Sequence, residues 1–264
     1  MHNRIRTIAS FFFLLLIIST GTLFAQEGLT GLQVMQKVYN RPIPEDQQDT
    51  MIMTLKNSRG SRRVRNISQY SKTYESDSKK IMFFTSPADV RGTSFMSFSY
   101  EDEEKQDDQW IYLPALKKVK RISSSSSNNS FMGSDFTYDD IGDRHPSEDT
   151  HRIISEEKFN GQKCIVVESI PKDPDSAYSR TLSWIVPDKW FGLKKEFYDP
   201  EGVLLKTLII KDYKQIDGYW MLVELEMYNS QKEHSTLIEL QDLKLNTNID
   251  DRLFTTRTMI KGVH

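Results

Sequence analysis

The sequence predicts a mainly β protein with few, short helices, built largely from antiparallel strands. Segments of alternating apolar and polar residues recur along the chain, and in Tyr219–Met227 every odd position is apolar. Turn-forming pairs such as Asn160-Gly161 and Asp217-Gly218 separate these segments. One face of such strands packs while the other faces water, which is typical of an antiparallel meander.

The N-terminus has the order of a secretory signal peptide. Arg4 and Arg6 precede a short apolar run, and Ala25 ends the stretch of small residues after it. The run is shorter than the roughly 20 residues that span a bilayer, although a retained anchor helix is the alternative. We therefore expect residues 1–25 to be cleaved and residues 26–264 to form a single β domain, soluble in the periplasm.

Composition excludes several classes of protein. Lys and Arg total 35 against 37 Asp and Glu, and loss of Arg4 and Arg6 leaves 33 against 37, a net charge of −4. Such a balance argues against a nucleic-acid-binding protein, which would carry a basic excess. Cys164 is the only cysteine, so no internal disulfide can form, and no cysteine follows the cut to carry a lipid anchor. We expect Cys164 to be a buried structural thiol on a strand.

A helix is expected at Thr30–Tyr39, capped by Thr30, with Leu32, Met35 and Tyr39 on its apolar stripe. Strands are expected over 51–55, 61–74, 80–85, 93–100, 109–113, 162–170, 180–186, 193–198, 204–213, 219–229 and 235–245. In the last of these the alternation slips between Leu240 and Leu243, which indicates a bulge or the end of the strand. The strands could close into a full or partial barrel, form a sandwich, or curve around a short helix.

Catalytic and metal-binding patterns are not found. His145 and His151 lie near several carboxylates, but their spacing matches no common zinc motif, and a solvated acidic loop is expected there. The acidic residues of 101–108 lack the spacing of a calcium loop and are expected in a solvated hairpin loop. We therefore expect no catalytic residue, no metal and no cofactor. A hydrolase using His145 or His151 with a neighbouring carboxylate is the enzymatic alternative.

The segment from Trp110 to Ile141 needs a special explanation. Trp110–Ile122 (WIYLPALKKVKRI) joins two aromatic residues to a basic stretch, and residues 123–130 form a Ser/Asn-rich run expected to be a mobile loop. Phe131–Ile141 then places apolar anchors among aspartates. The segment is either a hairpin strand, a loop and a docked amphipathic piece, or a flexible flap over a hydrophobic opening with a basic rim.

Several segments of this chain are similar to a known protein family. Trp110–Ile122 and Phe131–Ile141 resemble the outer-membrane lipoprotein-sorting protein family, relatives of the LolA and LolB carriers. Pro87–Phe95, Trp184–Trp190 and the turn at Asp199–Gly202 are similar to other parts of the family, so that the likeness runs from about Thr30 to Phe254. It implies a half-open antiparallel β-barrel with short helices in its mouth, an apolar interior that accepts acyl chains, and no catalytic residues.

The resemblance implies a periplasmic carrier of lipid or lipid-modified protein that moves cargo between membranes or to and from an inner-membrane exporter. Partners would be lipid or an acylated lipoprotein, an exporter of the RND or MMPL type, or an outer-membrane acceptor. The alternative is a non-catalytic interaction or sensor module of the same fold that docks on a membrane transporter.

Two groups of side chains are candidate site residues. A head-group or partner rim is expected at Lys117, Lys118, Lys120 and Arg121. Acyl chains need apolar and deformable surroundings, which methionine supplies. The expected cavity or flap residues are Met51, Met53, Leu55, Trp110, Tyr112, Phe131, Met132, Phe136, Trp184, Met221 and Val223.

Overall fold

A computed structural model describes residues 28–74, 77–102 and 105–263. The expected signal peptide, residues 1–25, therefore lies outside the described residues. Thirteen strands form one antiparallel sheet. They are β1 (Asp46–Lys56), β2 (Arg62–Thr73), β3 (Ser78–Ser86), β4 (Ser94–Ser99), β5 (Asp108–Leu113), β6 (Lys118–Arg121), β7 (Asp149–Phe159), β8 (Gln162–Pro171), β9 (Arg180–Val186), β10 (Phe191–Tyr198), β11 (Leu204–Ile216), β12 (Tyr219–Asn229) and β13 (His234–Leu245).

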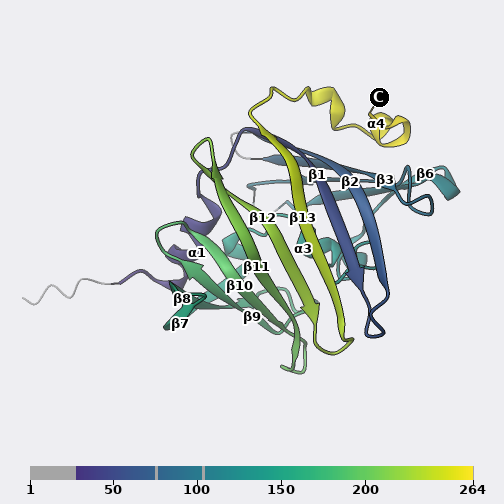
Figure 1. Ribbon diagram of the computed structural model, residues 1–264. Helices are drawn as coiled ribbons and strands as arrows, with labels where there is room; N and C mark the ends of the chain where they lie inside the picture. Colours follow the sequence, from purple (N-terminus) through teal and green to yellow (C-terminus); the bar gives the residue numbers. More distant parts are fainter. Residues whose placement is uncertain (1–27, 75–76, 103–104, 264) are drawn as a thin grey trace, which may run out of the picture.

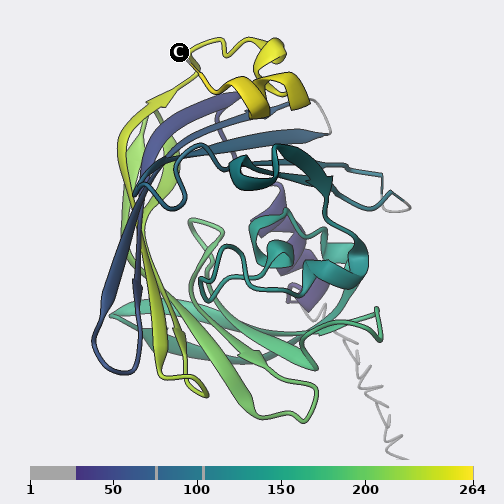
Figure 2. The ribbon, with the colours of Figure 1, turned by 90° about the vertical axis from the view of Figure 1, so that its right-hand side faces the viewer.

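The sheet is a meander in which one pair of neighbouring strands, β1 and β13, comes from distant parts of the sequence. Its order is β6-β5-β4-β3-β2-β1-β13-β12-β11-β10-β9-β8-β7, so β1 and β13 join the two runs of strands. The sheet curves strongly around a central space but does not close, because β6 and β7 do not pair (Figures 1 and 2). The predicted mainly β, half-open antiparallel barrel is therefore confirmed. Its opening lies where the chain leaves the sheet, between residues 121 and 149.

Strand β1 shows how the alternation of apolar and polar residues in the sequence produces an apolar inner wall. Met51, Met53 and Leu55 are buried on one face of β1, where they face the barrel interior. Their cross-strand neighbours Ile67 in β2 and Ile238 in β13 are buried in the same hydrophobic cluster. Successive side chains of a strand point to opposite faces, so the period of two in the sequence becomes one continuous apolar wall.

The irregularity expected near the end of β13 is a bulge. Gln48 pairs with Lys244 and Thr50 with Gln241, so β13 carries an additional residue in this stretch. Asp242 adopts a left-handed backbone conformation with φ 53°. The strand continues to Leu245 beyond the bulge, and the extra residue accounts for the slip in alternation.

The short helices lie around and inside the barrel. They are α1 (Gly31–Tyr39), α2 (Ser124–Ser127), α3 (Tyr138–Ile141) and α4 (Thr256–Lys261), with 3₁₀ turns η1 (Pro114–Leu116), η2 (Pro146–Glu148) and η3 (Asp251–Leu253). None of the helices in the described part of the chain is both long and apolar enough to cross a bilayer. The Ser/Asn-rich run contains the single turn of α2, and its mobility stays a prediction.

Helix α1 begins where the sequence predicts. Thr30 Oγ1 accepts a hydrogen bond from Gln33 N, and the Gln33 side chain accepts one from Thr30 N, which completes a capping box. The expected apolar stripe is wrong in one position, because Leu32 is exposed and the buried residues are Gly31 and Val34. A Cβ at Gly31 would lie 2.7 Å from Arg152 N, so α1 approaches β7 too closely for any side chain there.

Strand β7 is absent from the expected strands, and its neighbourhood is not the predicted solvated loop. Its residues alternate between half-buried and exposed from Asp149 to Glu156, and a bulge between Ile153 and Ser155 shifts its pairing with β8. As a charged edge strand it lacks the apolar run by which strands are recognised. His151 lies on β7, half-buried, with its ring nitrogens 2.8 Å from Ser169 Oγ and 2.7 Å from the Pro146 carbonyl oxygen.

The chain after β13 covers the outer face of β3 and β4. Ile249, Phe254 and Met259 are buried there against Ile81 and Met96. This C-terminal segment, residues 246–263, lies across the outside of the sheet in Figure 2. Lys72 Nζ donates to Asp251 Oδ1 at 2.7 Å and to the Ile249 carbonyl oxygen at 2.9 Å, which fixes the segment to β2. No helix or strand is predicted from the sequence beyond residue 245, so this segment was not anticipated.

One polar pair interrupts the inner wall. Asp49 in β1 and Gln69 in β2 are directly opposite each other, and both are buried. Gln69 Nε2 donates to Asp49 Oδ1 at 3.3 Å, but Asp49 Oδ2 and Gln69 Oε1 have no partner in the described residues. Buried acceptors without donors are unfavourable, and a proton on Asp49 would remove the charge of its carboxylate and add a donor to this pair. Burial raises the pKa of Asp49 to about 6, although hydrogen bonds from Gln47 and Gln69 oppose the shift.

This pair predicts a pH dependence of stability. The pKa of Asp49 is raised above the roughly 3.9 of an unfolded chain, so the folded state binds the proton more tightly. Its contribution to the free energy of unfolding should be fully present below pH ~4 and be lost as the pH rises to about 6. Asp49→Asn should raise the free energy of unfolding at pH 8 by about 1–3 kcal/mol, measured by urea denaturation. Glu201→Gln, at an exposed turn, is the control, and equal pH profiles for wild type and Asp49→Asn would contradict the prediction.

Candidate functional site

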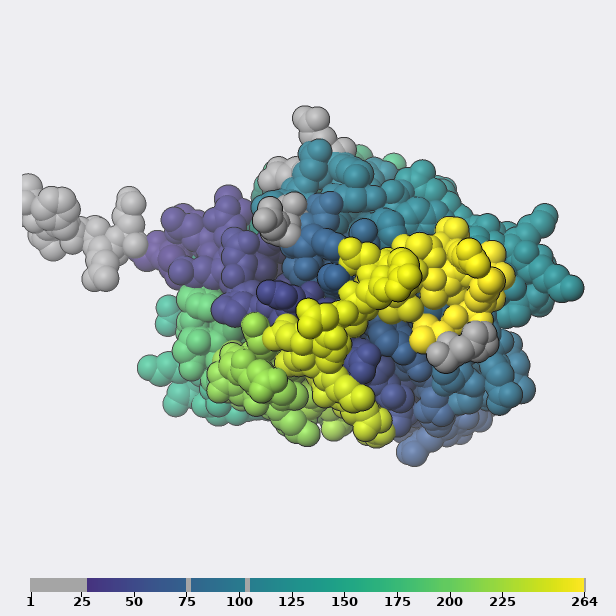
Figure 3. Space-filling model, turned by 90° about the horizontal axis from the view of Figure 1, so that it is seen from above, coloured from purple at the N-terminus to yellow at the C-terminus, as the bar shows by residue number. Residues whose placement is uncertain are grey.

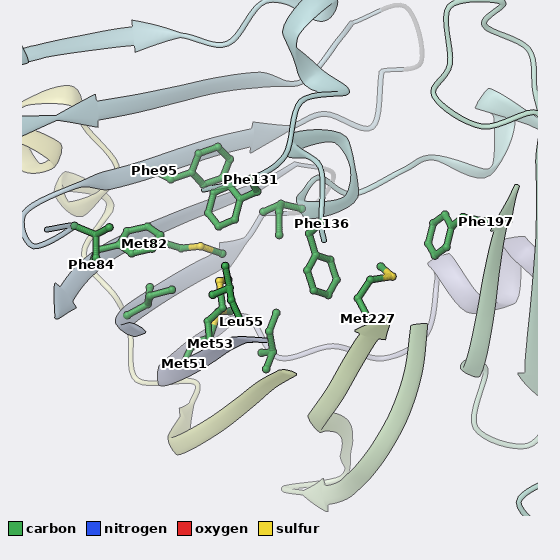
Figure 4. Packing of buried hydrophobic residues seen from close by; sticks show 14 of the residues in the cluster. Met51, Met53, Leu55, Met82, Phe84, Phe95, Phe131, Phe136, Phe197 and Met227 are labelled. Carbon is green, nitrogen blue, oxygen red and sulfur yellow. The ribbon is translucent and has the colours of Figure 1, made fainter. Parts of the chain in front are cut away.

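The interior of the barrel is the candidate site. Its apolar wall comes from β1 to β4 on one side and from β10, β12 and β13 on the other (Figure 4). The buried wall residues are Met51, Met53, Leu55, Ile67, Met82, Phe84, Phe95, Phe197, Met227 and Ile238. Methionine and phenylalanine predominate, so the wall combines deformable thioethers with large flat rings.

The connection between β6 and β7 turns inward and fills this space. We call Phe131–Ile141 the plug. Phe131 and Phe136 are buried in the wall cluster, with Ile141 beside them and Met132 and Tyr138 packed against it. The Phe131 ring lies 5.1 Å from Phe95 and 6.1 Å from Phe84, centroid to centroid. Burial of each such ring contributes about 1.5–3 kcal/mol.

The plug is a compact loop. Phe131 N donates to the Phe136 carbonyl oxygen at 2.7 Å, and Ser130 and Thr137 form an isolated antiparallel bridge. Met132 and Gly133 both have left-handed backbone conformations, with φ 52° and 76°, which glycine adopts without cost. The loop therefore reverses tightly and presents both rings to the wall.

Polar contacts hold the plug to the first half of the sheet. The Arg65 guanidinium in β2 donates to the Met132 carbonyl oxygen. Lys80 Nζ in β3 donates to the Ile141 carbonyl oxygen at 3.1 Å, and Gln109 Nε2 in β5 donates to the Tyr138 carbonyl oxygen at 3.0 Å. These bonds satisfy carbonyl groups that would otherwise be buried without partners.

A second set of contacts, centred on two aspartates of the plug, holds it to the other half. Lys206 Nζ in β11 lies 2.5 Å from Asp140 Oδ2 and 2.9 Å from the Asp135 carbonyl oxygen, and both charged side chains are more than nine-tenths buried. Asp135 Oδ2 lies 2.7 Å from both His234 Nδ1 and Thr236 Oγ1 of β13. The Tyr178 hydroxyl donates to Asp140 Oδ1 at 3.0 Å.

The interior is charged at the end near α1. Arg144 pairs with Asp149 at 2.7 Å, Glu148 at 3.2 Å and Asp139 at 3.6 Å. Burial raises the pKa of Asp107 to about 6, and the charges of Asp143 and Glu148 add to this shift. Desolvation lowers the pKa of Lys195, whose side chain is half-buried on β10. The space inside the sheet is thus amphipathic, with an apolar part around the plug and a charged part beside η2.

The expected cavity residues fall into four groups. Met51, Met53, Leu55, Phe131 and Phe136 are in the interior cluster, with Met132 packed against it. Trp110 and Tyr112 pack instead against the outer cluster beneath the C-terminal segment, and Trp184 lies in a separate cluster with Phe191. Met221 and Val223 are buried in β12. Ligand binding by any of these residues stays a prediction.

The expected rim residues lie together at the open edge of the sheet. Lys118, Lys120 and Arg121 are exposed on β6, and Lys117 precedes them with φ 49°. Arg121 pairs with Asp108. No cluster of three or more metal-ligating side chains occurs within residues 28–74, 77–102 and 105–263.

The residues that hold the plug were missed by sequence reasoning. Asp135 and His234 are 99 positions apart, and Asp140 and Lys206 are 66 positions apart, so no local pattern connects them. One signal was available in the sequence, since Lys206 stands between Leu204-Leu205 and Leu208–Ile210, in a predominantly apolar strand. A lysine in the middle of a buried strand calls for a carboxylate partner.

A hollow of about 500 Å³ lies elsewhere, beside α1. Trp190, Lys37 and Arg41 line it, and Lys37 Nζ lies 5.0 Å from the centre of the Trp190 ring. Trp190 has φ 52°, which is unusual for a bulky residue. This hollow lies outside the interior cluster and shares no lining residue with the plug.

The buried ion pair predicts a large loss of stability on truncation. Lys206→Ala leaves Asp140 charged and buried, so the free energy of unfolding should fall by about 3–5 kcal/mol, measured by chemical denaturation. The combined change Lys206→Met with Asp140→Asn removes both charges and should recover most of this loss. Lys211→Ala is the matched control, because Lys211 lies on the same strand as Lys206, and its pair with Glu226 is half-exposed and should contribute less than about 1 kcal/mol. Similar losses for Lys206→Ala and Lys211→Ala would contradict the assignment.

Comparisons with known proteins now give the family. A family model described only as an uncharacterized protein matches residues 76–261, and a search of curated proteins gave no match. An outer membrane lipoprotein-sorting protein domain from Vibrio parahaemolyticus is 37% identical, with a TM-score of 0.82 over 87% of this chain and 98% of that one. A DUF1329 family protein from Desulfovibrio piger is 29% identical, with a TM-score of 0.81 over 87% and 97%.

A more distant neighbour shows the fold alone. A LolA superfamily protein from Nitrosomonas europaea is 19% identical, with a TM-score of 0.67 over 87% of this chain and 99% of that one. The similarity extends over the thirteen-stranded open sheet described above. The resemblance that was expected from Trp110–Ile141 is confirmed. The chain belongs to the outer-membrane lipoprotein-sorting protein family.

Proposed function

We propose that this protein is a periplasmic carrier that binds the acyl chains of a lipid or a lipid-modified protein inside the barrel and passes them between membranes. Family membership supports a role of this kind. The observation that carries the proposal is the apolar inner wall, which is covered by a segment of the chain and by no further strand of the sheet. A wall of this kind becomes available once the plug moves.

The interior suits an amphipathic ligand. An acyl chain that replaces Phe131 and Phe136 would gain about 0.8 kcal/mol for each buried CH₂ group. Its polar end would then meet the charged region around Arg144 and Lys195, in the same interior space. Non-covalent contacts fix the plug, so binding can displace it at a finite free-energy cost.

The role is non-catalytic. Both histidines of the hydrolase alternative form local hydrogen bonds, His145 with Ser147 and His151 with Ser169 and Pro146. The cargo donor or acceptor would be an exporter of the inner membrane or an acceptor of the outer membrane. A filled interior favours a second candidate, an interaction module of the same fold that docks on a membrane transporter without carrying lipid.

The two candidates predict different contents of the purified protein. Protein released from the periplasm without detergent should contain stoichiometric phospholipid or acylated peptide, detected by lipid extraction and mass spectrometry. A protein that is empty and that also fails to bind a fluorescent fatty acid would overturn the carrier proposal in favour of the interaction module.

Two variants test whether a bound ligand displaces the plug. Phe131→Ala should destabilise the free protein by about 3–5 kcal/mol, and it should also raise the apparent affinity for a fluorescent fatty acid, since less packing has to be displaced. Phe191→Ala is the control, because that ring is equally buried but lies in a separate cluster with Tyr213 and Trp220. Its fatty-acid affinity should equal that of wild type. Equal affinities for both variants would exclude displacement of the plug.

A further inference from the structure

Two distant segments form one basic surface at the open edge of the barrel. Helix α4 packs against β4 and β6. Ser94 Oγ donates to the Met259 carbonyl oxygen at 2.9 Å, and Ser94 is opposite Tyr112, which is opposite Val119. Helix α4 therefore lies beside β6, which directly follows the turn at Pro114–Lys117. Figure 3 shows the yellow C-terminal segment lying next to the teal chain.

The cations of this surface surround the edge strand. They are Lys117, Lys118, Lys120, Arg121, Arg257 and Lys261, all exposed. Val119 packs outward beneath the C-terminal segment, so Lys118 and Lys120, which alternate with it, project from the other face of β6. Within the described residues only Arg121 of these six forms an ion pair, with Asp108. Neither 114–122 nor 255–263 contains Asp or Glu, although the whole chain carries a net charge of −2.

Aliphatic side chains stand among these charges. Leu116 is 49% exposed, Ile260 53% and Val263 48%, and they lie in the same two segments. Exposed aliphatic tips among exposed cations suit a surface that is anionic outside and apolar just beneath, which is the boundary of a bilayer. An acidic protein would match the cations but would leave the aliphatic tips without a partner.

We propose that the surface formed by β6, its preceding turn and α4 docks the protein on an anionic lipid bilayer. The inference deepens the proposed function, because docking there would bring the open edge of the barrel, and with it the route to the plug, to the membrane from which cargo comes. The proposal adds α4 to the basic rim of β6 and assigns lipid head groups as the partner of this surface.

The test is sedimentation of the purified protein with vesicles. It should bind vesicles that contain phosphatidylglycerol but not vesicles of pure phosphatidylcholine, and binding should weaken as salt is raised. Each cation near an anionic surface contributes roughly fivefold to binding, so Lys117→Gln with Lys118→Gln and Lys120→Gln should weaken it at least tenfold. Leu116→Ser with Ile260→Ser should weaken binding while leaving its salt dependence unchanged.

A matched control removes equal charge elsewhere. Lys158→Gln with Lys163→Gln and Lys232→Gln neutralises three exposed lysines on other hairpins and should leave vesicle binding unchanged. Absence of binding to anionic vesicles, or equal losses in the two triple variants, would overturn the proposal. The lysines of β6 would then serve to prevent edge-to-edge pairing, or would meet an acidic protein. Fatty-acid binding is measured separately on the same variants, so failure of docking and failure of the carrier proposal are distinguishable.

Discussion

The inner wall of an unclosed barrel has to be covered, and the rest of this structure depends on how it is covered. Strands β1 to β4 and β10 to β13 form an apolar concave surface that a thirteen-stranded sheet cannot bury by itself. The chain leaves the sheet between β6 and β7, at the same place where the barrel is open, and returns through the interior. One connection thus spans the opening and supplies the rings that complete the core.

The polar contacts of the plug determine its position more than they stabilise it. Burial of Lys206 and Asp140 removes two charges from water, and such pairs contribute little net stability compared with apolar residues. Their geometry fixes one arrangement, in which Asp140 also accepts from Tyr178 and Asp135 bonds to β13. Packing of Phe131 and Phe136 would tolerate several placements, whereas directional bonds at both sides of the barrel select one.

Local patterns in the sequence predicted the sheet well and the interior poorly. Alternation in β1 and β12 and the turns between strands are short-range signals, so strands, hairpins and the bulge near Asp242 could be anticipated. Strand β7 was missed because an exposed edge strand with a bulge has no apolar period. In α1 the close approach of Gly31 to β7 rotates the buried stripe away from Leu32, which is a tertiary effect.

The arrangement of the candidate site could be recognised only in part. Family likeness indicated an apolar interior, and aromatic anchors near Phe131 suggested a flap. The pairing of Asp135 with His234 and of Asp140 with Lys206 depends on the curvature of the sheet, which no local pattern encodes. The position of α4 could not be predicted either. Its few apolar residues do not indicate that it covers the outer face of β3 and β4.

The pairing of β1 with β13 also affects the order in which the chain can fold. Strand β1 lies at the middle of the wall, yet one of its two neighbours begins only at His234. Until that residue has been synthesised, Met51 and Met53 can be flanked on one side alone, and the two runs of strands cannot join. Contacts of such large sequence separation form slowly. A chain that emerges from its N-terminus therefore cannot complete its sheet before β13 is free.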